Sequence, residues 1–160
     1  MESSGPAETI VVAGDHPLAA DVTALLQRHL AFTHASSPPD DVHALDVPAL
    51  VEPSITFVSA RRAGALLGIG ALKQLDSEHV EVKSMHTATE ARGQGIGRLV
   101  LDHLLEVARA AGAHRVSLET GTQEVFAPAR SLYTTAGFVP CEPFADYRPS
   151  PQSTFLTRDL

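Results

Sequence analysis

Apolar residues recur at helical spacing in three segments of the chain. Residues 17 to about 32 predict an amphipathic helix, with Asp15 as its N-cap. The pattern is strongest over 95–111, where one face is apolar and the other charged, and Gly112 follows at the place where helices commonly end. A shorter helix is expected over 128–135. Each of these helices needs a partner on which to bury its apolar face.

Runs of alternating or continuous apolar residues predict the strands of a sheet. The expected strands are 8–13, 55–59, 65–73, 79–87, 115–119, 138–141 and 154–157, with a short helix or turn at 46–51. Gly68 and Gly70, inside the third strand, predict a bulge or a close approach by another backbone. The last strand is expected at an edge. The order β-α-α-β-β-β-α-β-α-β-β predicts an α/β fold with a mixed sheet and helices on both faces.

Composition narrows the classes of protein that the chain can be. Its 160 residues fit a single domain, 1–160, in which 1–7 form a flexible tail. A net charge of −7 disfavours a nucleic-acid or polybasic membrane surface. One cysteine, Cys141, excludes an internal disulfide, and the eight histidines lack metal-ligand spacing. The chain starts without a secretory signal and lacks an apolar run of bilayer length, so a cytoplasmic location is expected.

The most informative stretch is a glycine-rich turn, 92–97 (RGQGIG), between a predicted strand and the strongest predicted helix. Its glycines let backbone N–H groups approach a ligand, and a helix N-terminus attracts anions. Arg92 and Arg98 could pair with phosphates. A Walker A loop needs a Gly-Lys pair that the sequence lacks, and a Rossmann fingerprint needs glycine where Arg98 stands. Both nucleotide interpretations are therefore disfavoured.

Two segments resemble the GNAT family of acyl-CoA-dependent N-acetyltransferases. Arg92-x-x-Gly95-x-Gly97 is similar to the family signature [QR]-x-x-G-x-[GA], in the expected place between a strand and a long helix. The segment 129–138 (ARSLYTTAGF) is similar to the family pattern A-x-x-L-Y-x-x-x-G-F. Segments 34–46 and 118–147 also resemble a bacterial subgroup called YsnE-like. The resemblance implies a mixed, mostly antiparallel central sheet, flanked by helices on both faces, and acetyl-CoA as co-substrate.

The resemblance also implies how acetyl-CoA would be bound. In the family, amides of the glycine-rich loop hold the pyrophosphate, and the strand before it pairs with the pantetheine through its backbone. Such pairing needs a gap in the sheet, because a closed ladder has no free N–H or C=O groups. The residues implied in coenzyme binding are Met85, His86, Thr87, Arg92, Gly93, Gln94, Gly95, Ile96, Gly97 and Arg98.

Acetyl transfer needs a base for the amine proton and an acid for the departing thiolate. Glu81 has the strand position of the base in some family members, or it merely pairs with Lys83 or an arginine. Alternation along the strand places Lys83 on the same face as Glu81 and His86 on the opposite face. Tyr133 matches the family tyrosine that protonates the thiolate, or it is a core residue that anchors a helix.

The acceptor site is the least determined part of the sequence. His34, Lys83 and Tyr147 are expected to contact the substrate. Phe126 stands where many family members have an asparagine that contacts pantetheine. That contact is either lost or replaced by one from Thr120 or Gln123. The alternative for Phe126 itself is that it packs in the core.

The predicted function is acetyl transfer from acetyl-CoA to a primary amine of a small molecule or peptide, by direct attack in a ternary complex. An alternative is a non-catalytic acyl-CoA-binding or regulatory module with the same fold. A phosphate-loop nucleotide binder is the third hypothesis. A homodimer is a family-level expectation, and no metal is expected in the site.

Overall fold

The computed structural model describes residues 9–38 and 45–160. Its strands are β1 (Ile10–Gly14), β2 (Ile55–Arg62), β3 (Ala65–Gln74), β4 (His79–Thr87), β5 (Arg115–Gly121), β6 (Val139–Pro140) and β7 (Ser153–Asp159). Its helices are α1 (Ala20–Ser36), α2 (Val47–Leu50), α3 (Ile96–Ala110) and α4 (Ala127–Thr135), with short 3-10 turns η2 (Thr89–Ala91) and η3 (Glu124–Phe126). The predicted order of helices and strands is confirmed. The expected flexible tail, 1–7, lies outside the described residues.

The strands form one sheet in the order β1-β2-β3-β4-β5-β7-β6. All neighbours are antiparallel except β4 and β5, which are parallel. The predicted mixed, mostly antiparallel sheet is therefore confirmed. The prediction that the last strand lies at an edge is wrong, because the short β6 returns after α4 and pairs Val139 with Thr157 of β7.

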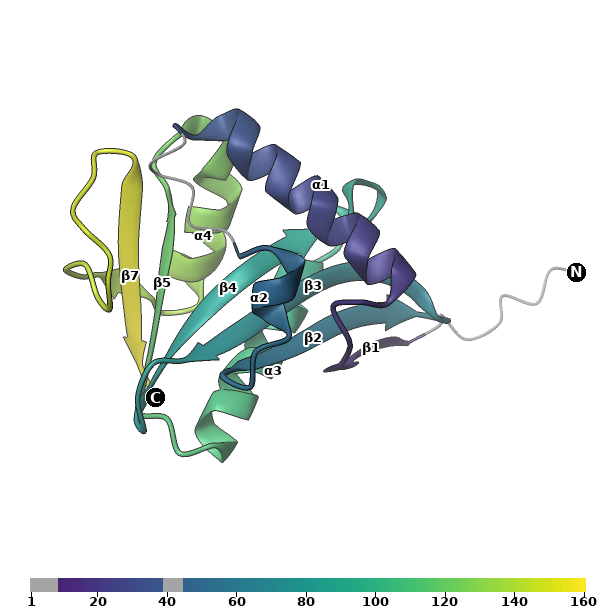
Figure 1. The fold of residues 1–160 in the computed structure, drawn as a ribbon, viewed down its shortest axis with the longest axis horizontal. Helices are drawn as coiled ribbons and strands as arrows, with labels where there is room; N and C mark the ends of the chain where they lie inside the picture. Colours follow the sequence, from purple (N-terminus) through teal and green to yellow (C-terminus); the bar gives the residue numbers. More distant parts are fainter. Residues whose placement is uncertain (1–8, 39–44) are drawn as a thin grey trace, which may run out of the picture.

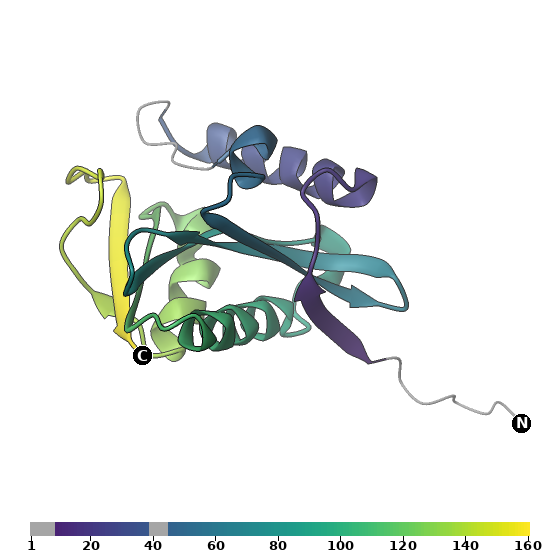
Figure 2. The same ribbon diagram turned by 60° about the horizontal axis from the view of Figure 1, so that its bottom comes forward.

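Helices cover both faces of the sheet, as predicted. α1 and α2 lie on one face, and α3 and α4 lie on the other (Figure 2). The face of α3 that meets the sheet is apolar and buried; its buried residues are Ile96, Val100, Leu101, Leu104, Leu105 and Ala108. None of the helices in the described ranges is long and apolar enough to cross a bilayer. The cytoplasmic location stays a prediction.

Two glycines of β3 allow α3 to lie close against the sheet. A Cβ atom built on Gly70 would lie 2.7 Å from both the Met85 sulfur and the Val100 Cγ1. One built on Gly68 would lie 2.8 Å from the Ile96 Cγ2. These distances are shorter than real Cβ contacts, so a side chain at either position would force its neighbours on α3 or β4 to shift. The neighbours of Gly70 are side chains of α3 and β4, so the predicted approach by another backbone is wrong there, whereas a Cβ atom on Gly68 would lie 3.2 Å from the His86 carbonyl oxygen. The predicted bulge is confirmed, because the register with β4 shifts between Ile69 and Ala71.

The start of α1 differs from its prediction. Asp15 was the expected N-cap, but α1 begins at Ala20 and its N-cap position, Ala19, makes no side-chain capping bond. The Asp15 carboxylate instead accepts hydrogen bonds from the Ser59 hydroxyl and, at 3.0 Å, from the Arg61 Nε of β2. Asp15 therefore ties the segment after β1 to the neighbouring strand. The helix also continues past residue 32 to Ser36.

Candidate active site

A gap between β4 and β5 organises the site. The two strands pair only at their starts, from His79 opposite Arg115 to Glu81 opposite Ser117. β4 then continues to Thr87 and β5 to Gly121 as the strands diverge (Figure 1). No strand in the described ranges pairs with the later half of β4 on this edge. Backbone groups there can bind an extended ligand as a strand would, which is the gap that the resemblance implied.

A cavity of about 770 Å³ lies where the strands diverge. Its walls come from β4, the loop before α3, the start of α3, β5, α4 and α1. Nearly all the expected coenzyme residues line it: Met85, His86, Thr87, Arg92, Gly93, Gly95, Ile96, Gly97 and Arg98. The exception is Gln94, whose side-chain oxygen accepts hydrogen bonds at 3.3 Å from the guanidinium of Arg62.

The glycine-rich loop has the backbone geometry of an anion site. Gly93 and Gly95 have φ angles of +76° and +78°, a left-handed conformation that favours glycine, and Gly95 is the N-cap of α3. A Cβ atom built on either glycine would have no neighbour within 4 Å, so the loop borders open space. The first N–H groups of α3 have no acceptor within the helix, so they are available to an anion bound at the loop. Arg92 is exposed beside it, whereas the Arg98 Nε is 2.9 Å from Asp102.

A β-bulge in β4 changes which side chains share a face. Lys83 lies opposite Ala71 and His86 opposite Ile69, so two residues of β4 stand opposite one residue of β3. Ser84, within the bulge, has a φ of +56°. His86 therefore lies on the same face as Lys83, toward α1, where its Nδ1 is 3.1 Å from the Nδ1 of His29. The prediction that His86 points to the opposite face is wrong, because alternation is interrupted at the bulge.

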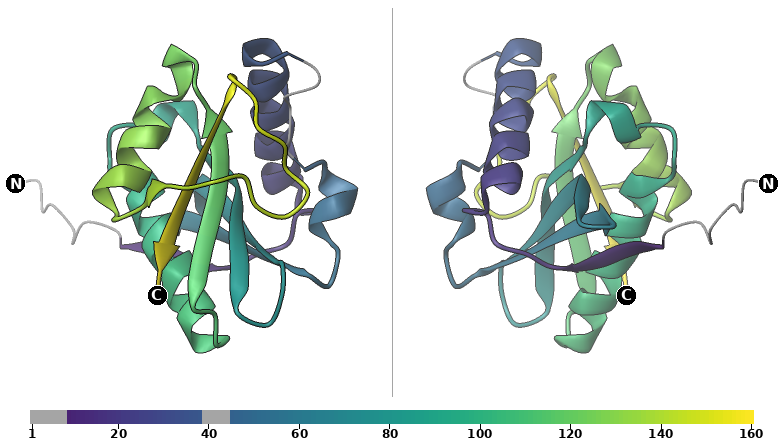
Figure 3. Two further views of the ribbon diagram at one scale, coloured as in Figure 1. Left: turned by 90° about the vertical axis from the view of Figure 1, so that its left-hand side faces the viewer. Right: turned by 90° about the vertical axis from the view of Figure 1, so that its right-hand side faces the viewer.

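Glu81, Lys83 and Tyr147 form one hydrogen-bonded cluster on the α1 face. The Lys83 Nζ lies 3.1 Å from a Glu81 carboxylate oxygen and donates to the Tyr147 hydroxyl at 2.8 Å. The Tyr147 hydroxyl in turn donates to Glu81. The Glu81 and Lys83 side chains are only 3% and 8% exposed, so each needs the other's opposite charge. Tyr147 reaches the cluster from residues 141–152, which cross β5 toward the side of α1 and α2 (Figure 3, left).

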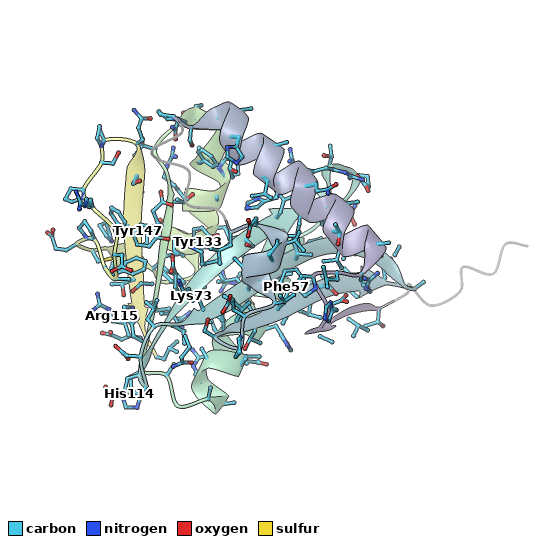
Figure 4. The ribbon with its side chains drawn as sticks, viewed as in Figure 1. Phe57, Lys73, His114, Arg115, Tyr133 and Tyr147 are labelled. Carbon is cyan, nitrogen blue, oxygen red and sulfur yellow. The ribbon has the colours of Figure 1, made fainter. Side chains whose placement is uncertain are left out.

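The two site tyrosines keep their protons. Burial, followed by the charge of Glu119, raises the pKa of Tyr133 above its usual value. Burial, the Glu81 charge and the hydrogen bond to Glu81 raise the pKa of Tyr147. Tyr133 reaches the cavity from α4 and Tyr147 from the segment before β7, and both are labelled in Figure 4. Two phenols that remain protonated at neutral pH thus border the same cavity.

The structure separates the three expected acceptor residues. Lys83 and Tyr147 line the cavity, but His34 is exposed and lies outside its lining. α1 was expected to end near residue 32 but continues to Ser36, so that His34 belongs to the helix. Phe32 and Thr33 of the same helix line the cavity instead.

The position of the family asparagine is filled by packing. The Phe126 ring meets the Phe32 ring edge-on, with centroids 5.5 Å apart, and lines the cavity. Thr120 also lines the cavity, whereas Gln123 donates a 2.8 Å hydrogen bond to Gln152 and lies outside the lining. Thr120 is thus the better placed of the two proposed replacements for a coenzyme contact.

Sequence reasoning missed two groups in the cavity wall. Glu119 of β5 lines the cavity, although no motif marks it. His29 of α1 pairs with His86, and burial and the neighbouring His86 lower the pKa of His29 to about 4. Burial and the charges of Arg92 and Arg28 likewise lower the pKa of His86 to about 4. Alternation along β5 could have placed Glu119 on one face with Ser117, but nothing in the sequence places β5 beside β4.

Comparisons with known proteins identify the family of the chain. Residues 20–138 match the profile of the Acetyltransferase (GNAT) family. The chain is 46% identical to YsnE of Bacillus subtilis (strain 168), over 87% of this chain and 92% of that protein. It is 48% identical to YedL of Escherichia coli (strain K12), over 87% of each chain. Both relatives are named as uncharacterized N-acetyltransferases.

Solved structures share the fold. A crystal structure of an acyl-CoA N-acyltransferase from Klebsiella pneumoniae, so named provisionally, has a TM-score of 0.77 and 26% identity, over 94% of this chain and 97% of that one. A Bacillus subtilis acetyltransferase in complex with CoA has a TM-score of 0.72 and 18% identity, over 95% of this chain and 99% of that one. With the profile match and the two relatives, these findings show that the chain belongs to the acetyltransferase (GNAT) family.

Proposed function

We propose that the chain transfers the acetyl group of acetyl-CoA to a primary amine of a small molecule or peptide, by direct attack in a ternary complex. The observation that carries the proposal is the gap between β4 and β5, which opens beyond Glu81 and Ser117 into a cavity with an anion-binding loop at its wall. A structure of the same fold in complex with CoA supports the assignment of the ligand.

Acetyl-CoA fits the cavity through its two recognisable parts. The loop amides of 92–97 and the N-terminus of α3 would hold the pyrophosphate, because they present N–H groups and a positive dipole end. The backbone of residues 85–87 would pair with the pantetheine as an added strand. The thioester would then lie near Tyr133, a residue of α4, which forms one wall of the cavity.

The chemistry follows from this placement. The neutral amine attacks the thioester carbonyl carbon, the C–S bond breaks, and the thiolate leaves with a proton from the Tyr133 hydroxyl. No nucleophilic side chain is needed, because the amine itself attacks. A carboxylate of the cavity must accept the amine proton, and Glu81 is the candidate that the sequence indicates.

The charge of the acceptor side favours a cationic substrate. Two carboxylates, Glu81 and Glu119, line this side of the cavity, and Lys83 pairs with Glu81. The chain as a whole has a net charge of −7, and carboxylates attract an ammonium substrate. Phe32 and Phe126 give the same cavity an apolar wall.

The test is incubation of the protein with acetyl-CoA and a panel of primary amines, with free thiol release as the readout. We expect thiol release that depends on both the amine and the protein. A shift in melting temperature with acetyl-CoA, but no turnover with any amine, would favour the non-catalytic acyl-CoA-binding module. Stabilisation by ATP in place of coenzyme A would instead favour the nucleotide binder. The homodimer stays a prediction, to be checked by sedimentation.

A further inference from the structure

Glu119 occupies the wall of the cavity that faces Glu81 across the gap. It lies on β5 just past Ser117, the last residue of β5 that pairs with β4. Side chains alternate along a strand, so Glu119 shares a face with Ser117, and directly opposed residues of neighbouring strands also share a face. Ser117 is opposite Glu81. Both carboxylates therefore lie on the α1 face of the sheet, one on each side of the opening.

The two carboxylates differ in exposure. Glu81 is 3% exposed, and one of its oxygens receives hydrogen bonds from both Lys83 and Tyr147. This oxygen is therefore already occupied, and the buried Glu81 side chain is held between Lys83 and Tyr147. Glu119 is only partly buried, lines the cavity, and lies close enough to Tyr133 and Tyr147 that its charge raises the pKa of both.

We propose that Glu119 accepts the proton of the acceptor amine, and that Glu81 is a positioning residue that holds Lys83 and Tyr147 in place. The proposal rests on the proposed acetyl transfer and assigns its base to a residue that no motif indicates. Glu119 and Tyr133 line one cavity, so a base and an acid stand at the site of the thioester on neighbouring elements, β5 and α4.

The proton balance of the step is complete with these groups. The Glu119 carboxylate removes one proton from the substrate ammonium, and the nitrogen lone pair forms a bond to the carbonyl carbon. The C–S bond then breaks, the sulfur takes the Tyr133 proton, and the nitrogen loses its second proton as the amide forms. One of the two nitrogen protons restores the Tyr133 hydroxyl and the other passes to solvent, so that an ammonium and a thioester give an amide, a thiol and one proton.

The test compares Glu119→Gln with Glu81→Gln on two substrates. One is an amine of the panel that the wild-type protein acetylates, and the other is its analogue with fluorine near the nitrogen, a weaker base that is largely neutral already. For Glu119→Gln we expect kcat/KM to fall by about 10²-fold or more with the parent amine and much less with the analogue. The acidic limb of the pH profile should also be lost. The shift in melting temperature with acetyl-CoA should persist.

The control variant should behave differently. Glu81→Gln is expected to lower kcat/KM equally with both amines and to keep the acidic limb, because it disturbs the position of Lys83 and Tyr147 and leaves the base in place. If Glu119→Gln fails to fold, Glu119→Asp should retain the acidic limb at a lower kcat. An unchanged difference between the amines in a folded Glu119→Gln, or loss of the limb in Glu81→Gln alone, would overturn the assignment. Absence of turnover by the wild-type protein would overturn the proposed function itself, and the assignment with it.

Discussion

Glu81 and Ser117 are the last pair of residues that join β4 to β5, and the two strands separate beyond them. This pair marks the start of the site. Beyond it, the N–H and C=O groups of β4 on this edge have no partner strand within the described part of the chain, and a cavity of about 770 Å³ begins. The pair also orients the carboxylates, because Glu81 and Glu119 are fixed on the same face by the register of the two strands.

Gly95 offers a test of the glycine-rich loop. Gly95→Ala is expected to weaken acetyl-CoA binding strongly, because its φ of +78° suits glycine and its amide belongs to the anion-binding loop. The strain should lower stability by about 1 kcal/mol. Gly112→Ala is the matched control at the other end of α3, with a φ of +86° and no role in the cavity. Calorimetric titration should show normal coenzyme affinity for Gly112→Ala, and equal losses in both variants would contradict the loop's role.

Tyr133→Phe tests the acid. The variant keeps the ring that meets Phe138 edge-on, so folding and coenzyme binding should survive. Turnover should fall by about 10²-fold, because the thiolate would depart without its proton donor. Steady-state kinetics and a melting-temperature shift with acetyl-CoA measure the two properties separately. Loss of coenzyme binding would identify Tyr133 as a structural residue instead.

Gly70 tests the close contact between β3 and α3. Gly70→Ala is expected to lower the free energy of unfolding by about 1–3 kcal/mol, since the added Cβ would lie 2.7 Å from the Val100 Cγ1 in a packed core. Gly14→Ala, at the end of β1, has nothing within 4 Å of the added atom and should change stability little. Urea unfolding of both variants gives the comparison. A Gly70→Ala variant as stable as Gly14→Ala would show that α3 packs less closely than described.

The pair His29 and His86 predicts how stability depends on pH. Both pKa values are lowered to about 4 in the folded protein, so unfolded chains bind more protons between pH 4 and the usual histidine pKa of 6.5. Stability is therefore highest above pH 6.5 and falls as the pH drops toward 4, by roughly 2 kcal/mol at pH 5 for His29 and by less for the more exposed His86. Melting temperatures between pH 7.5 and 5 should show this loss.

Two variants separate the buried pair from the other titrating groups. His86→Gln should flatten the pH dependence of the melting temperature. It removes the titrating imidazole of His86 and, with it, the positive charge that adds to burial in lowering the pKa of His29. His114→Gln is the matched control at a position where the side chain is 73% exposed, and the slopes of the two variants are compared. The lowered pKa of Asp15 acts only below its ordinary value of 3.8, outside this range. An equal slope in His86→Gln and the wild-type protein would rule out the pair as its cause.

The elements of the fold could be predicted because local patterns mark them. The period of 95–111, the glycines of β3 and the turn at 92–97 each act within a few residues, and the structure has α3, the close contact and the loop where these patterns indicate. Asp15 shows the limit of local rules. It looks like a helix cap, but its tertiary partners on β2 compete for the carboxylate.

The acceptor side of the cavity could not be predicted, because it is formed by contacts between residues far apart in the sequence. One extra residue in β4 at Ser84 turns His86 toward α1, against simple alternation. The position of Glu119 opposite the Glu81 side of the gap follows only from the register of β5 against β4. Tyr147 reaches Glu81 across a separation of 66 residues in the chain, which no motif describes.

Acetyl transfer in the gap between β4 and β5 can be followed with acetyl-CoA that carries an isotope in its acetyl group. The labelled compound is incubated with the protein and the amine panel, and the products are identified by mass spectrometry. We expect the label in an amide of one of the amines, formed with the wild-type protein and strongly reduced with Tyr133→Phe. Labelled acetate without labelled amide, or bound acetyl-CoA that stays intact with every amine, would contradict the proposed transfer.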